Sequence, residues 1–268
     1  MNETERKVFF ARNIQELFYQ KKTISALQVI GACTHLEHLP EKSISTTLIP
    51  ELRQIHKHER FIEFGPGVTL AEIMALGERH IPSILYQAVC GIANPFVRNI
   101  ATIGGNICAG PQRLSLFAPL LALDTLLELR SPSETSYISL QNFKSIPKDF
   151  VLTNIRIPLN DWDVSIYNRL GPSNKITENS AGFVFLADSE KNIITNIRIA
   201  FSGPITFRCI ALENKLLGLR LPLNEKMTAQ YSEEAAAVFD ETAEKKSYPP
   251  ILRQQFQNLI RYAFDQLT

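Results

Sequence analysis

The sequence is short of cysteine and of long apolar runs, and each shortage excludes a class of protein. Its four cysteines are Cys33, Cys90, Cys108 and Cys209. They lie far apart and form no C-x-x-C pair, so their spacing argues against a zinc or iron–sulfur site within the chain. No stretch approaches the roughly 18 consecutive apolar residues that a membrane-spanning helix needs. We therefore expect neither a metal site nor a membrane span.

Net charge is also nearly absent. Lys plus Arg total 28 and Asp plus Glu total 27, so no field of one sign attracts nucleic acid or an anionic membrane. The charged residues 1–7 lead straight into Phe9 and Phe10 without the apolar core of a signal peptide. We expect a cytoplasmic protein with reduced thiols. The five histidines show no metal-ligand spacing and no Ser–His–Asp pattern is visible, so we expect no catalytic side chain.

The composition, with 45% hydrophobic and 21% charged residues, is ordinary for a globular fold. Thr69 and Glu72 form a capping-box pattern, which predicts that a helix begins directly after Thr69. In the first 160 residues the apolar spacing predicts helices at 12–21, 70–79 and 83–90 and strands at 24–30, 43–49, 61–64, 125–129 and 150–159.

From about residue 160 the pattern changes to strands followed by helices. Residues 182–187 and 193–201 are two β-like runs, and the five residues between them predict an antiparallel hairpin with a longer turn. The rest is expected to be helical, at 206–217, 225–240 and 251–267. The chain is therefore assigned to the α+β class.

The most specific feature is the nine-residue string R-N-I-A-T-I-G-G-N at residues 98–106. We expect a sharp turn at Gly104-Gly105, because adjacent glycines can adopt positive φ and come close to a ligand. Successive amides in such a turn form a concavity that binds anions, and Thr102 and Asn106 would add polar groups at its edges. A bare Gly-Gly pair is more often a plain tight turn, but the full string is more specific.

This string resembles the second FAD-binding segment of the flavoprotein subunits of molybdenum hydroxylases, the xanthine dehydrogenase and carbon monoxide dehydrogenase family, where R-N-x-A-T-I-G-G-N recurs. Other segments resemble the same family, in the same order along the chain. They are residues 48–55 (L-I-P-E-L-R-Q-I), 64–73 (F-G-P-G-V-T-L-A-E-I), 120–125 (L-L-A-L-D-T), 151–158 (V-L-T-N-I-R-I-P) and, more loosely, 199–204 (I-A-F-S-G-P).

The resemblance implies a fold, a cofactor and partners. The fold would be a p-cresol-methylhydroxylase-type FAD-binding domain at residues 1–160, in two α/β lobes at about 1–57 and 58–160, followed by a small C-terminal domain of antiparallel strands and helices at residues 161–268. In such complexes a molybdopterin large subunit oxidises the substrate, and electrons pass through the [2Fe–2S] clusters of an iron–sulfur small subunit to FAD. FAD then reduces NAD⁺ or another acceptor.

The resemblance also implies two loops that bind FAD. The second contains Thr102, Ile103, Gly104, Gly105 and Asn106. The first contains Gly31, Ala32, Cys33, Thr34, His35 and Leu36, where the family has A-G-G-T-D-L. Ala32 and Cys33 replace both glycines of that pattern, and a Cβ there can block close approach or disfavour positive φ. The favoured interpretation of Cys33 is a small buried side chain and that of His35 a solvated loop residue, with a polar contact to the cofactor as the alternative for His35.

Three further positions have counterparts near the family's flavin. Ser115 stands where the family often has an aspartate that contacts the polar tail of the flavin, and a serine can still form a hydrogen bond there. Ile92 and Leu152 stand where apolar side chains pack near the flavin ring, although a simple core role is at least as frequent for such residues. Cys108 has no base nearby in the sequence and is interpreted as structural.

Three hypotheses about function follow. The first is a FAD-binding, electron-transferring oxidoreductase subunit of a molybdenum hydroxylase. The second, motivated by the altered first loop, is a non-redox scaffold subunit of the same fold that binds FAD weakly or not at all. The third is a free-standing FAD oxidase, which the short chain without a separate substrate domain disfavours.

Overall fold

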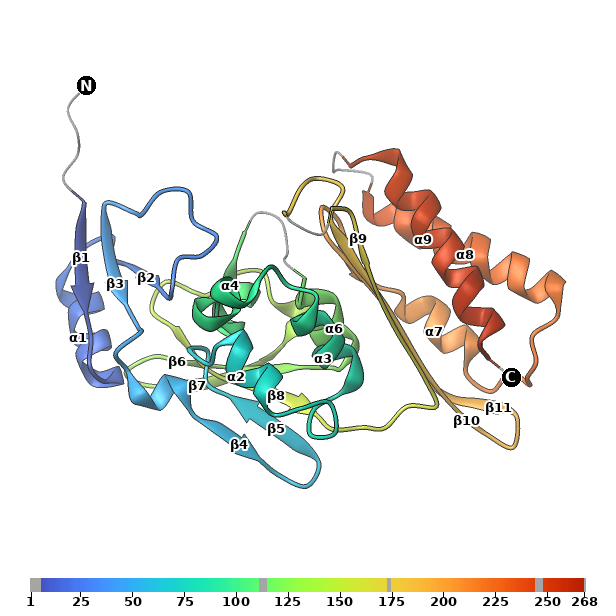
Figure 1. Ribbon diagram of the computed structural model, residues 1–268, viewed down its shortest axis with the longest axis horizontal. Coiled ribbons are helices and arrows are strands. Elements are labelled where there is room, and N and C mark those ends of the chain that lie inside the picture. The colour runs from blue at the N-terminus through green and yellow to red at the C-terminus, as the bar shows by residue number, and fades with distance from the viewer. Residues whose placement is uncertain (1–5, 111–114, 173–174, 244–247, 268) are drawn as a thin grey trace. The chain divides into compact units, whose positions relative to one another are not determined.

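A computed structural model of the chain describes residues 6–110, 115–172, 175–243 and 248–267. Residues 1–5 lie outside the described residues. They belong to the charged N-terminal segment in which no signal peptide was expected. The chain forms two compact units, each discontinuous in sequence (Figure 1). Unit 1 comprises Met1–Gly77, Asn94–Ala109 and Asp124–Leu159, and unit 2 comprises Glu78–Ala93, Gly110–Leu123 and Asn160–Thr268. The expected division into domains at residue 160 stays a prediction.

Unit 1 begins with a small parallel sheet of order β1-β3-β2. Its strands are β1 (Lys7–Phe10), β2 (Gln28–Ile30) and β3 (Lys42–Ser45). Helix α1 (Ile14–Thr23) begins two residues later than predicted, because the side chain of Asn13 caps it by accepting from the Glu16 amide at 2.8 Å. Buried side chains from α1, β3 and the residues that follow form one core cluster, which includes Leu17, Ile44 and Leu52.

The second sheet of unit 1 is antiparallel, with the order β4-β5-β8-β6-β7. Its strands are β4 (Ile55–Lys57), β5 (Phe61–Phe64), β6 (Leu126–Arg130), β7 (Thr135–Ser139) and β8 (Val151–Pro158). Two short 3-10 turns flank the edge strands: η1 (Pro50–Arg53) precedes β4, and η2 (Leu140–Asn142) follows β7. The strand predicted at 61–64 is confirmed residue for residue.

Three short helices complete unit 1: α2 (Leu70–Ala75), α4 (Pro95–Ile100) and α5 (Ile103–Cys108). The capping box before α2 is confirmed, with the Glu72 carboxylate accepting from the Thr69 amide at 2.7 Å. Helix α2 ends earlier than predicted because Gly77 adopts a φ of +83°. Asn94-Pro95, predicted to be only a breaker, begins α4, since the Asn94 side chain caps the helix and a proline suits its first turn.

Unit 2 contains an antiparallel sheet of order β12-β11-β10-β9. Its strands are β9 (Val164–Leu170), β10 (Ala181–Glu190), β11 (Ile193–Ser202) and β12 (Thr206–Arg208). The predicted hairpin is confirmed, but its turn is shorter than expected, because Lys191 and Asn192 take positive φ angles of 51° and 62°. The helix predicted from 206 is wrong at its start, since residues 206–208 pair with β11.

Helices cover both faces of this sheet (Figure 1). On one face lie α3 (Ser83–Cys90), which matches its prediction, and α6 (Phe117–Ala122). On the other lie α7 (Ile210–Leu216), α8 (Glu225–Ala243) and α9 (Pro250–Asp265). Aromatic rings from strands and helices meet edge to face in the core, with Phe201 and Phe256 centroids 5.4 Å apart. Helices and strands are mixed in both units, which confirms the α+β class.

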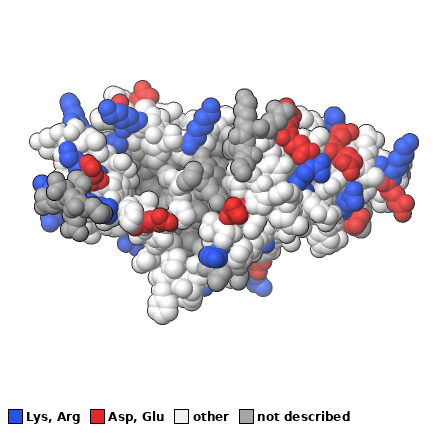
Figure 2. All heavy atoms as spheres, turned by 90° about the horizontal axis from the view of Figure 1, so that it is seen from above, with Lys and Arg blue, Asp and Glu red and all other residues white. Residues whose placement is uncertain are grey.

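Lys and Arg side chains are interspersed with Asp and Glu on the face shown in Figure 2, most densely over α8 and α9. The described surface in this view therefore presents no large area of one sign. No described helix is both long enough and apolar enough to cross a membrane.

Candidate functional site

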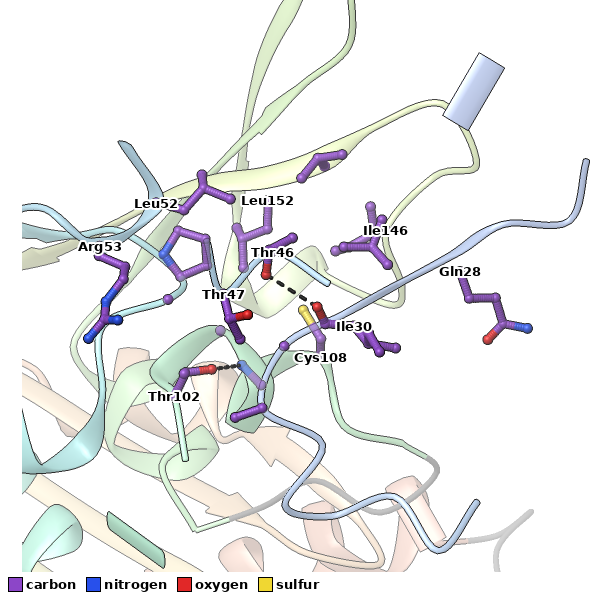
Figure 3. Close-up of a pocket in the computed structure, with 18 of the residues that line it drawn as sticks. Gln28, Ile30, Thr46, Thr47, Leu52, Arg53, Thr102, Cys108, Ile146 and Leu152 are labelled. Atoms are coloured by element: carbon purple, nitrogen blue, oxygen red, sulfur yellow. Dashed lines mark hydrogen bonds between the residues drawn. The ribbon is translucent and has the colours of Figure 1, made fainter. Parts of the chain in front are cut away.

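A cavity of about 510 Å³ opens in unit 1 (Figure 3), a size typical of small-molecule sites. It lies where β2 and β3 end: Gly31 and Ala32 follow β2, and Thr46 and Thr47 follow β3. Because the two strands are parallel, their carboxyl ends meet at one edge, which is where ligands bind in such sheets. The first turn of α5 forms another wall. The remaining walls come from the turns at residues 52–53 and 66–69, from residues 99–100 and from residues 146–152.

The first predicted loop leaves its amides available. The Leu36 amide donates to the Cys33 carbonyl oxygen at 3.2 Å. Within the described ranges the amides of Ala32, Cys33 and Thr34 donate to no other group of the chain. Three successive amides without an internal partner can bind an anion.

Cys33 occupies the second of the family's two glycine positions and takes the conformation that a glycine would favour. Its φ is +57°, in the left-handed region. The thiol lies 3.4 Å from the Gly31 carbonyl oxygen, to which it donates. Burial raises the pKa of the Cys33 thiol, so the group stays neutral. The loop therefore has a left-handed residue at Cys33 although no glycine stands there.

The sharp turn predicted at Gly104-Gly105 is wrong. Both glycines lie in the first turn of helix α5, and neither has a positive φ. Thr102 is the N-cap residue, and its hydroxyl accepts from the Gly105 amide at 3.0 Å. A helix N-terminus normally leaves its first amides unpaired. Here the chain itself satisfies them: Ile103 donates to Val68 O at 3.0 Å, Gly104 to Pro66 O at 3.0 Å and Asn106 to Thr102 O at 3.0 Å.

The glycines instead permit close packing between three segments. A Cβ on Gly104 would lie 2.7 Å from the carbonyl oxygen of Pro66, and one on Gly67 would lie 2.9 Å from that of Leu52. Such approaches to backbone oxygen atoms are too short for any Cβ. Helix α5 therefore packs on the turn at residues 65–67, and that turn packs on η1.

The two predicted loops face each other at the cavity. A Cβ built on Gly31 would lie 3.6 Å from the Thr102 hydroxyl oxygen. The Thr46 hydroxyl donates to the Ile30 carbonyl oxygen at 3.3 Å and so ties the end of β3 to the end of β2 (Figure 3). Figure 3 shows Arg53 and Gln28 on opposite sides of the cavity. The loops after β2 and β3 and the N-terminus of α5 are thus held as one rim.

The charged residues that line the described cavity are all cations: Lys21, Arg53 and Lys148. Arg53 is paired with Glu72, with Nη2 3.2 Å from Oε1. Burial lowers the pKa of Lys21, and the negative charge of Asp149 partly opposes that shift. Apolar side chains such as Leu27, Ile146 and Phe150 supply the rest of the walls. The cavity suits a ligand with an apolar ring system and an anionic part.

The cavity contains six of the predicted cofactor-binding residues: Gly31, Ala32, Thr102, Gly104, Gly105 and Leu152. Ile103 and Asn106 are buried within α5 and do not line it. Cys33, Thr34, His35 and Leu36 continue the first loop beyond the lining. Ile92 and Ser115 belong to unit 2. The cofactor roles of all of these residues stay predictions.

Several residues that line the cavity were not predicted from the sequence. Thr46 and Thr47 were missed because they lay inside the strand predicted at 43–49, whereas β3 ends at Ser45 and leaves both residues in the loop after it. Lys21 and Lys148 are 127 positions apart, and no local pattern indicates that both line one cavity. No group of three or more His, Cys, Asp or Glu residues that could hold a metal ion occurs in the described part of the chain.

Residues 4–160 match the family described as the FAD binding domain in molybdopterin dehydrogenase. The xanthine dehydrogenase FAD-binding subunit of Escherichia coli O157:H7 is 25% identical over 206 residues, 70% of this chain and 66% of that protein. The nicotine 6-hydroxylase medium subunit of Paenarthrobacter nicotinovorans is 27% identical over 176 residues, 62% and 60%. The chain thus spans just under two thirds of these relatives.

A solved carbon monoxide dehydrogenase from Hydrogenophaga pseudoflava contains a chain of similar fold. It has a TM-score of 0.80 and 18% identity, and the match covers 97% of this chain and 94% of that one. This likeness confirms the fold expected from the sequence.

Proposed function

This chain belongs to the family of FAD-binding domains of molybdopterin dehydrogenases, and we propose that it is the FAD-binding subunit of a multi-subunit molybdenum hydroxylase. The observation that carries the proposal is the cavity of unit 1. Its rim joins the two loops that correspond to the family's FAD-binding segments, through Gly31 and Thr102.

The residues of the cavity fit such a cofactor. The amides of Ala32, Cys33 and Thr34 and the cations of the lining would bind the diphosphate of the dinucleotide. The apolar walls at Leu27 and Phe150 would enclose a ring system. A glycine at position 31 leaves the space beside Thr102 open. Bulky side chains of the chain do not fill this space.

The protein's part in the chemistry is binding and orientation. Bound FAD would supply the capacity to accept electrons and pass them on. Apart from the three cations, the only titratable group in the described lining is the thiol of Cys108, and the role that we propose for the lining is to bind the cofactor. The side chains would hold the cofactor and exclude water from it.

The partners that we propose are an iron–sulfur small subunit and a molybdopterin large subunit. One relative is named a medium subunit and another a FAD-binding subunit, and such names describe parts of larger assemblies. Electrons would enter from the [2Fe–2S] clusters and leave to NAD⁺ or another acceptor. The cytoplasmic location expected from the sequence stays a prediction.

A scaffold subunit that does not bind FAD is the second candidate. Two observations favour it: Ala32 and Cys33 replace the glycines of the first loop, and the amides of α5 donate within the chain. Because the first-loop amides and the cavity remain open, we place the FAD-binding function first.

The test is to purify the full chain, record its visible spectrum and titrate it with FAD. We expect a flavin spectrum and uptake of about one FAD per chain. Gly31→Leu should abolish uptake because its side chain would occupy the space beside Thr102, whereas Gly110→Ala, which meets no atom within 4 Å, should bind as the wild type does. A colourless wild-type chain that takes up no added FAD would favour the scaffold. Co-purification with iron–sulfur and molybdopterin chains tests the proposed partners.

A further inference from the structure

The segment that was expected to form an anion-binding turn lies in the first turn of helix α5, and its main-chain amides cannot bind the diphosphate. The amides of residues 103–106 all donate to oxygen atoms of the chain, at 3.0 Å each. Breaking these bonds would also separate α5 from the turn at residues 65–67, because Gly104 donates to Pro66. The negative charge of a dinucleotide must therefore be balanced elsewhere in the cavity.

Two lysines that line the cavity are available for this purpose. Lys21 comes from the last turn of α1 and Lys148 from the segment that precedes β8. Neither has a carboxylate within ion-pair distance among the described residues. Arg53, in contrast, is already paired with Glu72. No aspartate or glutamate belongs to the described lining, although Glu72 pairs with Arg53 and the charge of Asp149 acts on Lys21. An anion that enters therefore meets a lining whose charged side chains are all cations.

Lys21 is held toward the wall that contains Lys148. Its ammonium nitrogen lies 3.5 Å from the carbonyl oxygen of Phe150, which also lines the cavity. Partial burial of the ammonium lowers the pKa of Lys21, and Asp149 is the carboxylate whose charge opposes that effect. A desolvated ammonium gains more from a nearby anion than a solvated one does.

We propose that Lys21 and Lys148 bind the phosphate groups of FAD through their side chains and make this chain select FAD over flavins without phosphate. The inference rests on the proposed function. In the first loop, Ala32 and Cys33 stand where glycines would let the backbone approach a phosphate closely. Lysine side chains reach an anion over a longer distance, and they compensate for that loss.

The experiment compares the affinities of the full-length chain for FAD and for riboflavin, which carries no phosphate. The variants are Lys21→Gln, Lys148→Gln, the double variant and the matched control Lys22→Gln. Lys22 is the next residue of α1 and does not line the cavity. Flavin fluorescence gives the dissociation constants at several salt concentrations, and circular dichroism verifies that each variant is folded.

We expect each single variant to weaken FAD binding by about tenfold, the usual effect of losing one charge-assisted hydrogen bond. The double variant should also show a smaller dependence of FAD affinity on salt concentration, since fewer charges interact. Riboflavin affinity should stay within about twofold of the wild type, as should every constant for Lys22→Gln. Lys21→Arg, unlike Lys21→Gln, should bind FAD nearly as well as the wild type does, because it keeps the positive charge.

Two negative results are distinguishable. A wild-type chain that binds no FAD would remove the proposed function and, with it, this inference. A wild-type chain that binds FAD, together with folded lysine variants of unchanged affinity and salt dependence, would overturn the inference and leave the proposed function intact. An equal loss for FAD and riboflavin would also overturn it, because a structural effect does not distinguish the two ligands.

Discussion

Gly104 donates its amide to the carbonyl oxygen of Pro66 at 3.0 Å, and a Cβ on Gly104 would lie 2.7 Å from that same oxygen. The glycine therefore serves a contact between two backbone segments. Its neighbour Gly105 would place a Cβ 3.0 Å from the Thr102 hydroxyl, which can shift more easily than a backbone atom. The Gly104-Gly105 pair, which was predicted to form a ligand-binding turn, is thus a packing surface that positions Thr102 at the cavity.

Gly104→Ala is expected to destabilise the chain. Alanine is the better helix former by about 1 kcal/mol, but the contact with Pro66 forces the backbone to move, at a cost of about 1–3 kcal/mol beyond that gain. Urea unfolding followed by circular dichroism measures the free energy of unfolding. Gly110→Ala, with no atom within 4 Å of the added carbon, should stay within about 0.5 kcal/mol of the wild type. A more stable Gly104→Ala would contradict the packing role.

Cys33→Gly should stabilise the chain by up to about 1 kcal/mol, because glycine adopts the left-handed φ of +57° without strain. FAD affinity, measured by flavin fluorescence, should stay equal or rise. Ala26→Gly is the matched control, since Ala26 has a φ of 60° and does not line the cavity; it should change stability alone. Cys33→Val should lower both quantities, since a β-branched residue is strained at positive φ. Weaker FAD binding by a stable Cys33→Gly would show that the thiol itself takes part.

The ion pair between Arg208 and Glu213 is expected to stabilise unit 2 strongly. Its side chains are only 9% and 4% exposed, and Nη2 and Oε2 are 2.9 Å apart. Glu213→Gln should cost about 3 kcal/mol, because it removes the charge of a buried carboxylate that pairs with this buried guanidinium. The control, Glu234→Gln, breaks the more exposed pair with Lys215 and should cost no more than about 1 kcal/mol.

Fluorescence of Trp162 measures this loss selectively. It is the only tryptophan of the chain and belongs to unit 2. Equal unfolding midpoints for Glu213→Gln and Glu234→Gln would show that burial does not decide the strength of the pair.

Acid should weaken unit 1 through Glu63. Burial alone would raise the pKa of Glu63, but hydrogen bonds and charge from Arg156, with smaller contributions from Asn154 and His58, lower it. A lowered pKa in the folded state means that the ionised carboxylate stabilises the fold above about pH 4.3, the ordinary value for glutamate. This stabilisation is lost as the pH falls through the folded-state pKa.

The corresponding measurement compares the free energy of unfolding of wild type and Glu63→Gln across the acid range. The difference should be constant at neutral pH and vanish at the acid end. Glu59→Gln, which changes a glutamate without an ion pair to a described residue, should show no such convergence. A difference between wild type and Glu63→Gln that does not change with pH would refute the assignment.

Features that depend on neighbouring residues were predicted well from the sequence. The capping box at Thr69 and Glu72 and the hairpin of β10 and β11 follow from patterns within about twenty residues. The short strands β1 and β12 were missed, because three or four residues are too few to show a clear alternating pattern. Strand β1 pairs with the distant β3, and β12 pairs with the end of β11 just before it.

The site was predicted in part, for the same reason. The two loops were found as motifs, and Gly31 and Thr102 do meet at one cavity. The conformation predicted for Gly104 was wrong because a distant contact, the hydrogen bond to Pro66, fixes it. That packing overrides the low helix propensity of glycine. Lys21 and Lys148 could not be found, since only the fold brings them to the same cavity.

The chain passes several times between its two units, and this has a consequence for truncated forms of the protein. Helix α6, whose residues Phe117–Ala122 are all buried, packs on β10 and β11, which follow it by some sixty residues. A fragment that stops at Leu159 would expose this apolar helix to water and aggregate. The strands that cover α6 come after residue 160, so we do not expect residues 1–159 to fold without them.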